Sequence, residues 1–233
     1  MSLLDWIYPP KCIACKMLLP LMHNAPKQRI CKQCMPLFVA IEEPFCKVCG
    51  HPGLPCPSCY GKTFHFEYNR AIFRYEDTVR DLIHKMKFQG QKQAAYALGD
   101  LIAKNLNFTG NYIIPVPLHK SKKRSRGFNQ ATVLAKPLSK ALNIPISENL
   151  LLRVKNTMPQ SQLNSHARED NLTDAFAYNK KKYKTPPDTL ILIDDIFTSG
   201  ATMNACAKVL KNNGVKQVIC VSLSIALKEV DQA

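Results

Sequence analysis

The segment Leu190–Thr202 constrains this chain more than any other part of its sequence. Its first four residues are apolar, as is typical of a parallel strand that is buried on both faces. Two adjacent carboxylates, Asp194 and Asp195, come next, and a turn of small and hydroxyl residues around Gly200 leads into a helix. A turn that enters a helix N-terminus offers free backbone N–H groups and a positive dipole end to a phosphate. Because carboxylates hold a sugar diol or a hydrated metal, the segment predicts a site for a phosphorylated ribose.

This segment resembles the signature with which type I phosphoribosyltransferases bind phosphoribosyl pyrophosphate (PRPP). In that family the acidic pair contacts the ribose 2- and 3-hydroxyls, and the turn wraps the 5-phosphate. The resemblance implies that Asp194 and Asp195 hold the ribose and magnesium. It implies a phosphate cradle made of Thr198, Ser199, Gly200, Ala201 and Thr202. The alternative interpretation is an acidic strand end and a capped helix that bind no ligand.

The cysteines point to a second kind of site. Eight of the ten cysteines form four C-x-x-C pairs: Cys12/Cys15, Cys31/Cys34, Cys46/Cys49 and Cys56/Cys59. Each pair can place two thiolates on one tetrahedral zinc, so two pairs complete a closed, structural site. Sequential pairing predicts two stacked zinc ribbons, whereas interleaved pairing, as in cross-braced fingers, would join the first pair to the third. Disulfides are the other possibility, which a cytosolic location disfavours.

The charge of the chain favours an anionic partner. The net charge is +15, and residues 115–185 carry fourteen lysines and arginines against four aspartates and glutamates. Such a concentration favours nucleic acid, phosphates or acidic lipid head groups, although a solvated basic surface would look the same. Repulsion within residues 120–126 predicts a mobile loop. The candidate residues for binding DNA or polyphosphate are Lys120, Lys122, Lys123, Arg124, Arg126 and Phe128. Phe128 either stacks on a base or anchors the start of the next helix.

The order of expected elements after residue 68 predicts the fold. Strands are expected at residues 69–76, 112–116, 190–193 and 218–223, and helices at 77–88, 93–106, 129–142 and 201–212. This alternation predicts an α/β fold with a doubly wound parallel sheet, in which ligands bind beyond the carboxyl ends of the strands. Pro137 should kink or split its helix. Residues 153–171, rich in side-chain amides, form either a lid or a simple connection. We expect a double zinc ribbon at residues 1–62 and a phosphoribosyltransferase-like domain at residues 63–233.

Nothing in the sequence indicates a membrane protein or a secreted one. No stretch approaches the ~20 apolar residues of a membrane span. The first ten residues carry Asp5 and lack a basic region followed by an apolar stretch, so they do not form a secretory signal. We therefore expect a cytoplasmic protein.

Taken together, these features resemble the ComF/GntX family of competence-associated proteins, which joins a double zinc ribbon to a phosphoribosyltransferase-like domain. The match includes the cysteine pairs, Pro115–Leu118, the block Arg126–Gln130 and the acidic pair. The Arg-Gly-Phe-Asn-Gln block after a Pro-Val-Pro-Leu strand end is its most specific part. The resemblance implies that Val116, Pro117 and Leu118 belong to the loop that receives pyrophosphate.

The resemblance also implies a function. It implies a competence factor that handles single-stranded DNA in the cytoplasm during natural transformation, beside the inner-membrane DNA channel and a helicase-like motor. Such a factor would carry two structural zinc ions and a PRPP-type site with magnesium. The alternative is an active phosphoribosyltransferase with a nucleotide-related or amine acceptor, although no catalytic residue is identifiable. A third interpretation is an assembly adaptor that docks through its zinc ribbons and N-terminal apolar residues.

Overall fold

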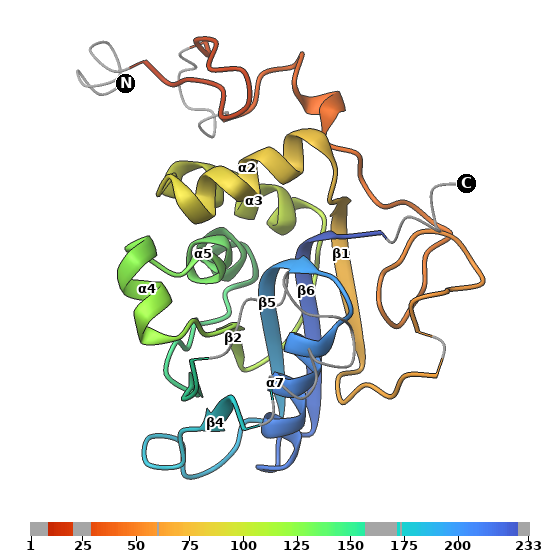
Figure 1. Ribbon diagram of the computed structural model, residues 1–233, viewed down its shortest axis with the longest axis vertical. Helices are drawn as coiled ribbons and strands as arrows, with labels where there is room; N and C mark the ends of the chain where they lie inside the picture. The colour runs from red at the N-terminus through yellow and green to blue at the C-terminus, as the bar shows by residue number, and fades with distance from the viewer. Residues whose placement is uncertain (1–8, 21–28, 60, 157–171, 173, 228–233) are drawn as a thin grey trace.

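A computed structural model describes residues 9–20, 29–59, 61–156, 172 and 174–227. Its centre is a parallel four-stranded sheet in the order β1–β6–β5–β2 (Figure 1). The strands are β1 (Tyr68–Arg74), β2 (Tyr112–Pro115), β5 (Thr189–Phe197) and β6 (Gln217–Ile225). The helices are α2 (Asp77–Phe88), α3 (Lys92–Lys104), α4 (Lys120–Arg126), α5 (Gln130–Leu142) and α7 (Ala201–Lys211). The predicted α/β fold is confirmed.

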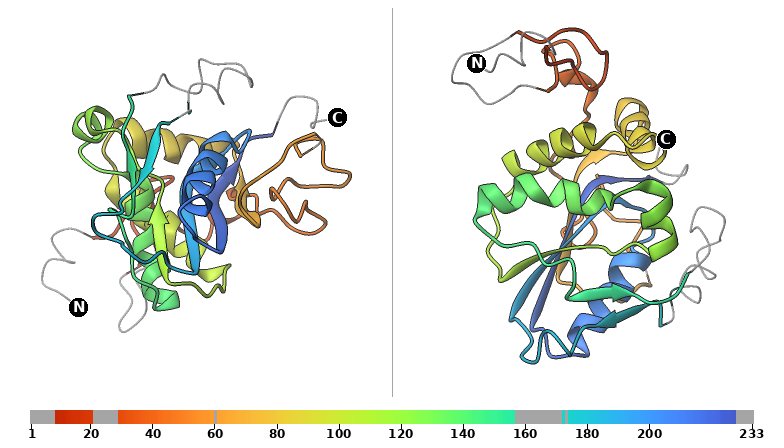
Figure 2. Two further views of the ribbon diagram at one scale, coloured as in Figure 1. Left: turned by 90° about the horizontal axis from the view of Figure 1, so that it is seen from below. Right: turned by 90° about the vertical axis from the view of Figure 1, so that its left-hand side faces the viewer.

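Helices cover both faces of the sheet. Successive side chains of a strand point to opposite sides, so each strand contributes apolar residues to both cores. Ile191 and Ile193 of β5 belong to the core beneath α2, α3 and α5. Leu190 and Leu192 belong to a second core beneath α7. In the two views of Figure 2, α7 lies on the other side of the sheet from α2, α3 and α5. The continuous apolar run of β5 is therefore explained by burial on two sides, as expected for a doubly wound sheet.

Strand β5 is longer than the sequence predicted. It continues beyond Ile193 to Phe197, so Asp194 and Asp195 lie inside its carboxyl-terminal part. Parallel pairing with β6 holds this extension, with Asp194 opposite Ser222 and Ile196 opposite Ser224. The acidic residues are thus fixed by the sheet ladder and not by a loop. A smaller antiparallel pair, β3 (Leu151–Arg153) and β4 (Phe176–Tyr178), lies outside the main sheet.

Helix α5 runs without interruption past Pro137, so the expected split does not occur. The reason is close packing against α3. A Cβ on Gly99 of α3 would lie 2.5 Å from the carbonyl oxygen of Leu134 and 3.1 Å from Cδ of Pro137. Because Gly99 has no side chain, the two helices approach closely enough for their buried faces to hold α5 together across the proline.

The segment expected as a mobile loop at residues 120–126 forms helix α4 instead. Its N-cap is His119, whose ring Nδ1 accepts a hydrogen bond from the N–H of Ser121 at 3.3 Å. Its C-cap is Gly127, in the left-handed conformation at φ +77°. Caps at both ends and charges exposed to solvent outweigh the repulsion between the lysines and arginines, so that prediction is wrong.

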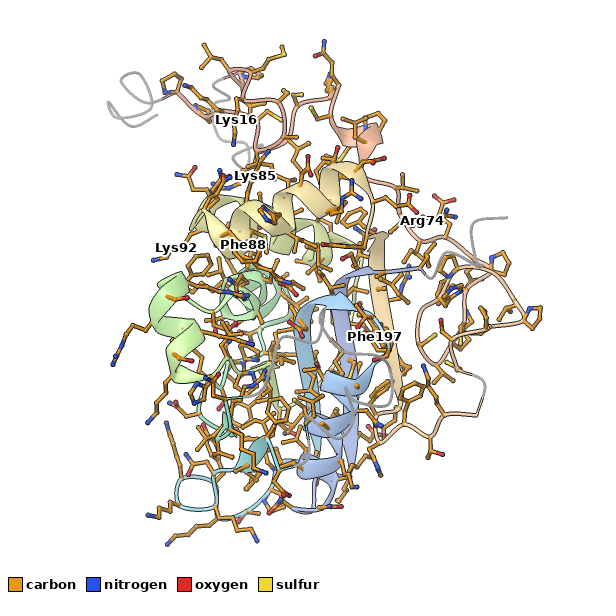
Figure 3. All side chains as sticks on the ribbon, viewed as in Figure 1. Lys16, Arg74, Lys85, Phe88, Lys92 and Phe197 are labelled. Carbon is orange, nitrogen blue, oxygen red and sulfur yellow. The ribbon has the colours of Figure 1, made fainter. Side chains whose placement is uncertain are left out.

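Phe128 anchors the helix that follows. Its side chain is only 7% exposed and belongs to the core beneath α2, α3 and α5. The ammonium of Lys92 lies 5.5 Å from the ring centroid of Phe128, and the guanidinium of Arg126 lies 5.7 Å from the ring centroid of Phe88. Figure 3 places Lys92 and Phe88 beside α4. The Phe128 ring is therefore not offered to a base, and the Arg126–Phe88 contact ties α4 to α2.

The N-terminal segments pack onto the sheet domain on two sides. Residues 39–48 run along the free edge of β1, as the backbone of Figure 1 shows. The N–H of Arg74 donates to the carbonyl of Val39 at 3.0 Å, and the N–H of Asn69 donates to the carbonyl of Val48 at 2.7 Å. Upstream, Ile13 and Leu19 pack over α2 and α3 on the side away from the sheet and belong to the same hydrophobic cluster as these helices. An edge strand is open to unwanted pairing, and here this segment covers it.

Some expectations fall outside the described residues. These are the docking role of the apolar residues before residue 9 and most of the lid or connection at residues 153–171. Within the described part of the chain, no helix is both long enough and apolar enough to span a bilayer.

Candidate functional site

The carboxyl ends of β2 and β5 border a cavity of about 520 Å³. Ten of the residues singled out by the sequence line it: Val116, Leu118, Lys122, Arg126, Asp194, Asp195, Thr198, Gly200, Ala201 and Thr202. Five others do not. Pro117, Lys120 and Lys123 line a neighbouring cavity, Arg124 is exposed, and the hydroxyl of Ser199 accepts from the N–H of Ala201 at 3.4 Å. The fold thus gathers the acidic pair, the turn and part of the basic segment around one space.

The two carboxylates have different surroundings. Asp195 is 7% exposed, and its Oδ2 lies 2.9 Å from the ammonium of Lys87 on α2. Asp194 is partly buried, and its Oδ1 accepts the backbone N–H of Asp195 at 2.8 Å. Burial and the adjacent charge of Asp195 raise the pKa of Asp194 to about 7. One carboxylate is therefore neutralised by a lysine, while the other exchanges its proton near neutral pH.

The raised pKa of Asp194 predicts how stability depends on pH. Between its ordinary pKa of 3.8 and about 7, the folded protein holds a proton that the unfolded chain has lost. Stability must therefore fall as pH rises through this window. Above pH 7 we expect the free energy of unfolding of Asp194→Asn to exceed that of the wild type by on the order of 1–2 kcal/mol. Urea unfolding at pH 5, 6, 7 and 8 measures the difference, and parallel pH profiles would contradict the prediction.

The turn before α7 requires glycine at residue 200. Gly200 has φ +80°, a conformation that L-residues rarely adopt. A Cβ there would lie 2.7 Å from Cζ of Phe197 and 2.9 Å from Cε1 of Phe64. The carbonyl of Gly200 accepts the N–H of Asn204 at 2.8 Å, which starts the helix. The N-terminus of α7 is thereby set at the cavity wall, where its free N–H groups favour an anion.

Gly200→Ala is expected to lower the free energy of unfolding by about 1–3 kcal/mol from backbone strain, with a further loss from the two ring clashes. The matched control is Gly53→Ala. Gly53 has the same φ of +80° but nothing within 4 Å of an added Cβ. Denaturant unfolding of both variants separates strain from clash. Equal losses would show that the contact with Phe64 and Phe197 has no importance.

Residues 63–66, which follow the last cysteine pair, pack against the turn before α7. The Phe64 and Phe66 rings stack with centroids 4.8 Å apart, and Phe66 meets Phe197 edge-on at 6.3 Å. The Asn204 side chain of α7 accepts the N–H of His65 at 2.7 Å and donates to the carbonyl of residue 63 at 3.2 Å. These contacts all lie within the expected domain 63–233 and tie its first residues to the turn before α7, which the sequence pattern did not reveal.

Two further cations belong to the cavity: Lys87, which the sequence analysis missed, and Arg153, which it placed at the start of the lid or connection. Lys87 and Arg153 line it together with Lys122 and Arg126. Burial, and then the charges of Arg153 and Arg126, lower the pKa of Lys122. A signal for Lys87 existed, because it follows buried Ile83 by four residues and so lies beside the apolar face of α2. Four cations facing two carboxylates leave a positive surplus that suits a phosphorylated ligand.

The cysteines form two clusters with sequential pairing, as the sequence favoured. In each cluster all four sulfur atoms lie within 4.8 Å of one another; the clusters are Cys12, Cys15, Cys31, Cys34 and Cys46, Cys49, Cys56, Cys59. The Cys15–Cys31 and Cys46–Cys59 sulfur distances are both 3.7 Å, and Cys49–Cys56 is 3.5 Å. Tetrahedral zinc with bonds of ~2.3 Å places its sulfurs ~3.8 Å apart. The donor sets therefore suit structural zinc.

The ionisation of the thiols supports a bound cation. Burial acts to raise the pKa of Cys12, but backbone N–H donors outweigh it and lower the pKa to about 6. The neighbouring Cys31 thiol raises the pKa of Cys34 to about 12. One thiolate forms readily, and its charge opposes the next. A divalent cation removes this conflict because the thiolate is the form that ligates metal.

Comparison with known proteins agrees with this architecture. Residues 3–63 match the double zinc ribbon domain, and residues 128–228 match the phosphoribosyl transferase domain. Competence protein F of Haemophilus influenzae is 30% identical over 220 residues, which cover 89% of this chain and 93% of that protein. DNA utilization protein YhgH of Salmonella typhi is 30% identical over 224 residues, covering 90% and 94%. Competence protein ComFC of Bacillus subtilis is 25% identical over 204 residues, covering 81% and 80%.

Among solved structures, adenine phosphoribosyl transferase from Trypanosoma brucei aligns with a TM-score of 0.33 and 11% identity, covering 63% of this chain and 71% of that chain. The sequence relatives share a higher identity with this chain than that structure does. They span most of both chains, and the domain matches fall on the segments where the structure has the cysteine clusters and the parallel sheet. This chain belongs to the ComF/GntX family, whose members join a double zinc ribbon to a phosphoribosyltransferase-like domain.

Proposed function

We propose that this protein serves competence and DNA uptake by binding single-stranded DNA in the cytoplasm, and that its cavity binds PRPP with magnesium. The names of the relatives, competence protein and DNA utilization protein, support the first part. The observation that carries the second part is the 520 Å³ cavity, in which an acidic pair, a helix N-terminus and four cations converge. Its volume lies in the range of small-molecule sites.

The groups around the cavity divide naturally among the parts of PRPP. Asp194 and Asp195 would hold the ribose hydroxyls and the magnesium, whose preferred ligands are oxygens. The turn 198–202 would hold the 5-phosphate. The loop 116–118, with Lys122 and Arg126, would hold the pyrophosphate. Because Lys87 already pairs with Asp195, a metal or diol at that carboxylate has to displace or share its ammonium.

DNA would follow the exposed side of α4. Lys120, Lys123 and Arg124 are exposed on this helix, outside the first cavity. Cations of this kind hold a phosphate backbone without reading its sequence. Residues 1–62 and 63–233 would be the two functional parts, which act beside the DNA channel and motor of the inner membrane. In this proposal the zinc ribbons stabilise the domain that carries both sites.

Filter binding of a single-stranded oligonucleotide across a salt series tests the DNA proposal. Replacement of Lys120, Lys123 and Arg124 by Gln should weaken binding and reduce the salt slope by up to about 2, at ~0.7 per phosphate contact. The control replaces Lys180, Lys181 and Lys182, which are exposed in another turn. No affinity at low salt, or equal losses in both variants, would refute a DNA surface on α4.

An active phosphoribosyltransferase is the second candidate. It is favoured by Asp194, whose pKa of about 7 lets it take up or release a proton beside the cavity near neutral pH. Such an enzyme would release pyrophosphate from PRPP when a nitrogen acceptor is supplied, and Asp195→Ala should abolish the release. PRPP binding without turnover across a set of nitrogen acceptors would leave a binding protein.

A further inference from the structure

A second cavity of about 460 Å³ adjoins the first at the carboxyl end of β2. Three residues line both cavities: Leu118, Asn129 and Arg153. Neither the acidic pair nor the turn at residues 198–202 lines the second one. The PRPP-type site therefore does not account for this space, although the two ligands would lie next to each other.

A buried hydroxyl faces no partner in the wall of the second cavity. Thr132 of α5 is 9% exposed, and its Oγ1 is buried without a hydrogen-bond partner among the described residues. Gln130 lines the first cavity, and its Nε2 is likewise buried and unpartnered within that part of the chain. Residues two apart on a helix point about 200° apart. The start of α5 thus contributes to the wall of each cavity one residue with a buried polar atom that lacks a partner among the described residues, and such groups favour a ligand that pairs with them.

The remaining walls combine apolar surface with a cationic mouth. Leu152 and Val154 are 37% and 54% exposed and line the cavity together with two prolines of the β2 end. Lys120 and Lys123 line it as well, and Lys123 lies 3.6 Å from the carboxylate of Glu148. The apolar side chains offer a surface for a planar ring, the polar ones offer hydrogen bonds to its edge, and the exposed lysines suit a phosphate.

We propose that the second cavity binds one nucleotide of a single strand, with the base inside and its phosphate on Lys120 and Lys123. This proposal rests on the proposed DNA function. The Thr132 hydroxyl both donates and accepts, and Glu148 and Asn149 in the same wall add acceptors and a donor for the base edge. A strand crossing α4 would thus splay one base into the protein, and PRPP would keep the first cavity.

The test blocks the cavity at an exposed position. Leu152→Trp should weaken binding of deoxynucleoside monophosphates at least tenfold and of 12-residue oligonucleotides about threefold to tenfold, measured by calorimetry. Thr132→Val, which keeps the shape and removes the hydroxyl, should weaken both about threefold to tenfold. The control is Leu37→Trp, since Leu37 is 52% exposed and lines neither cavity. Thermal unfolding verifies that each variant is folded.

The outcomes distinguish failure of the nucleotide pocket from failure of the proposed DNA function. Oligonucleotide binding that is unchanged in Leu152→Trp overturns the nucleotide pocket and leaves the DNA function standing. If PRPP displaces the monophosphates competitively, they occupy the first cavity, and this result also overturns the nucleotide pocket. If Leu152→Trp abolishes monophosphate binding but the wild type binds no oligonucleotide, the pocket takes free nucleotides. This result refutes both the proposal that the nucleotide belongs to a DNA strand and the DNA function. Losses in both assays, with PRPP binding intact, support the proposal.

Discussion

Cys49→Ala is expected to remove one zinc per chain and also to weaken PRPP binding at a cavity that contains no cysteine. Loss of a structural zinc site costs on the order of several kcal/mol. The Cys49 carbonyl accepts the side-chain amide of Asn69 in β1 at 2.9 Å. After the last cysteine of this cluster, Phe64 packs against Gly200. The side chain of Asn204 on α7 forms hydrogen bonds with the backbone of residues 63 and 65. A displaced turn should lower PRPP affinity on the order of 10- to 100-fold.

Zinc content, denaturant unfolding and calorimetry with PRPP and magnesium check this expectation. The matched variant is Cys15→Ala in the other cluster, where the sulfur ligand is exposed. The first cluster packs over α2 and α3 through Ile13 and Leu19, away from the turn. Cys15→Ala should therefore also lose one zinc yet retain most of its PRPP affinity. Equal losses of affinity would show that the two ribbons support the cavity alike, and no loss in either variant would show that neither does.

Lys87→Met is expected to lower the free energy of unfolding by about 3–5 kcal/mol, because it leaves the carboxylate of Asp195 buried and uncompensated. The ion pair is 2.9 Å long, and the two side chains are 20% and 9% exposed. The double variant Lys87→Met/Asp195→Asn should recover most of the loss, since neither charge then remains. Urea unfolding of the four proteins in a double-mutant cycle gives the coupling energy directly.

The control for this cycle is Lys85→Met. Lys85 lies on the same helix two residues earlier, and no ion pair joins it to another of the described residues. Figure 3 shows Lys85 and Phe88 on α2, and of these two residues only Phe88 lines the cavity. Its replacement should change stability by no more than about 0.5 kcal/mol. A coupling energy near zero between Lys87 and Asp195 would contradict the role of this pair.

The local pattern of the sequence predicted most of the secondary structure. The bounds of α2 match the predicted range, because its apolar residues repeat with helical spacing. The spacing of the cysteines allowed sequential or interleaved pairing, and the structure has the sequential one. Where prediction was wrong, another interaction was stronger than the local rule. Caps at His119 and Gly127 outweigh charge repulsion in α4, and packing against Gly99 outweighs Pro137 in α5.

The groups of the candidate site were predicted only in part. The acidic pair and the glycine turn are contiguous, so their chemistry can be read from one peptide. Lys87 and Arg153 reach the same cavity from distant segments, and nothing in their own neighbourhoods says which carboxylate they meet. The support that Phe64 gives to Gly200 is of the same kind.

The sequence by itself determined the local chemistry of this protein: four pairs of thiols, a buried strand followed along the chain by two carboxylates, and a helix entered through a glycine. The tertiary structure alone decided which charges meet, which edge of the sheet the zinc ribbon covers and which hydroxyl is buried without a partner. The reason is physical. Spacing along the chain fixes groups within one strand, turn or helix, whereas ion pairing and burial depend on distances through space that only the packed fold sets.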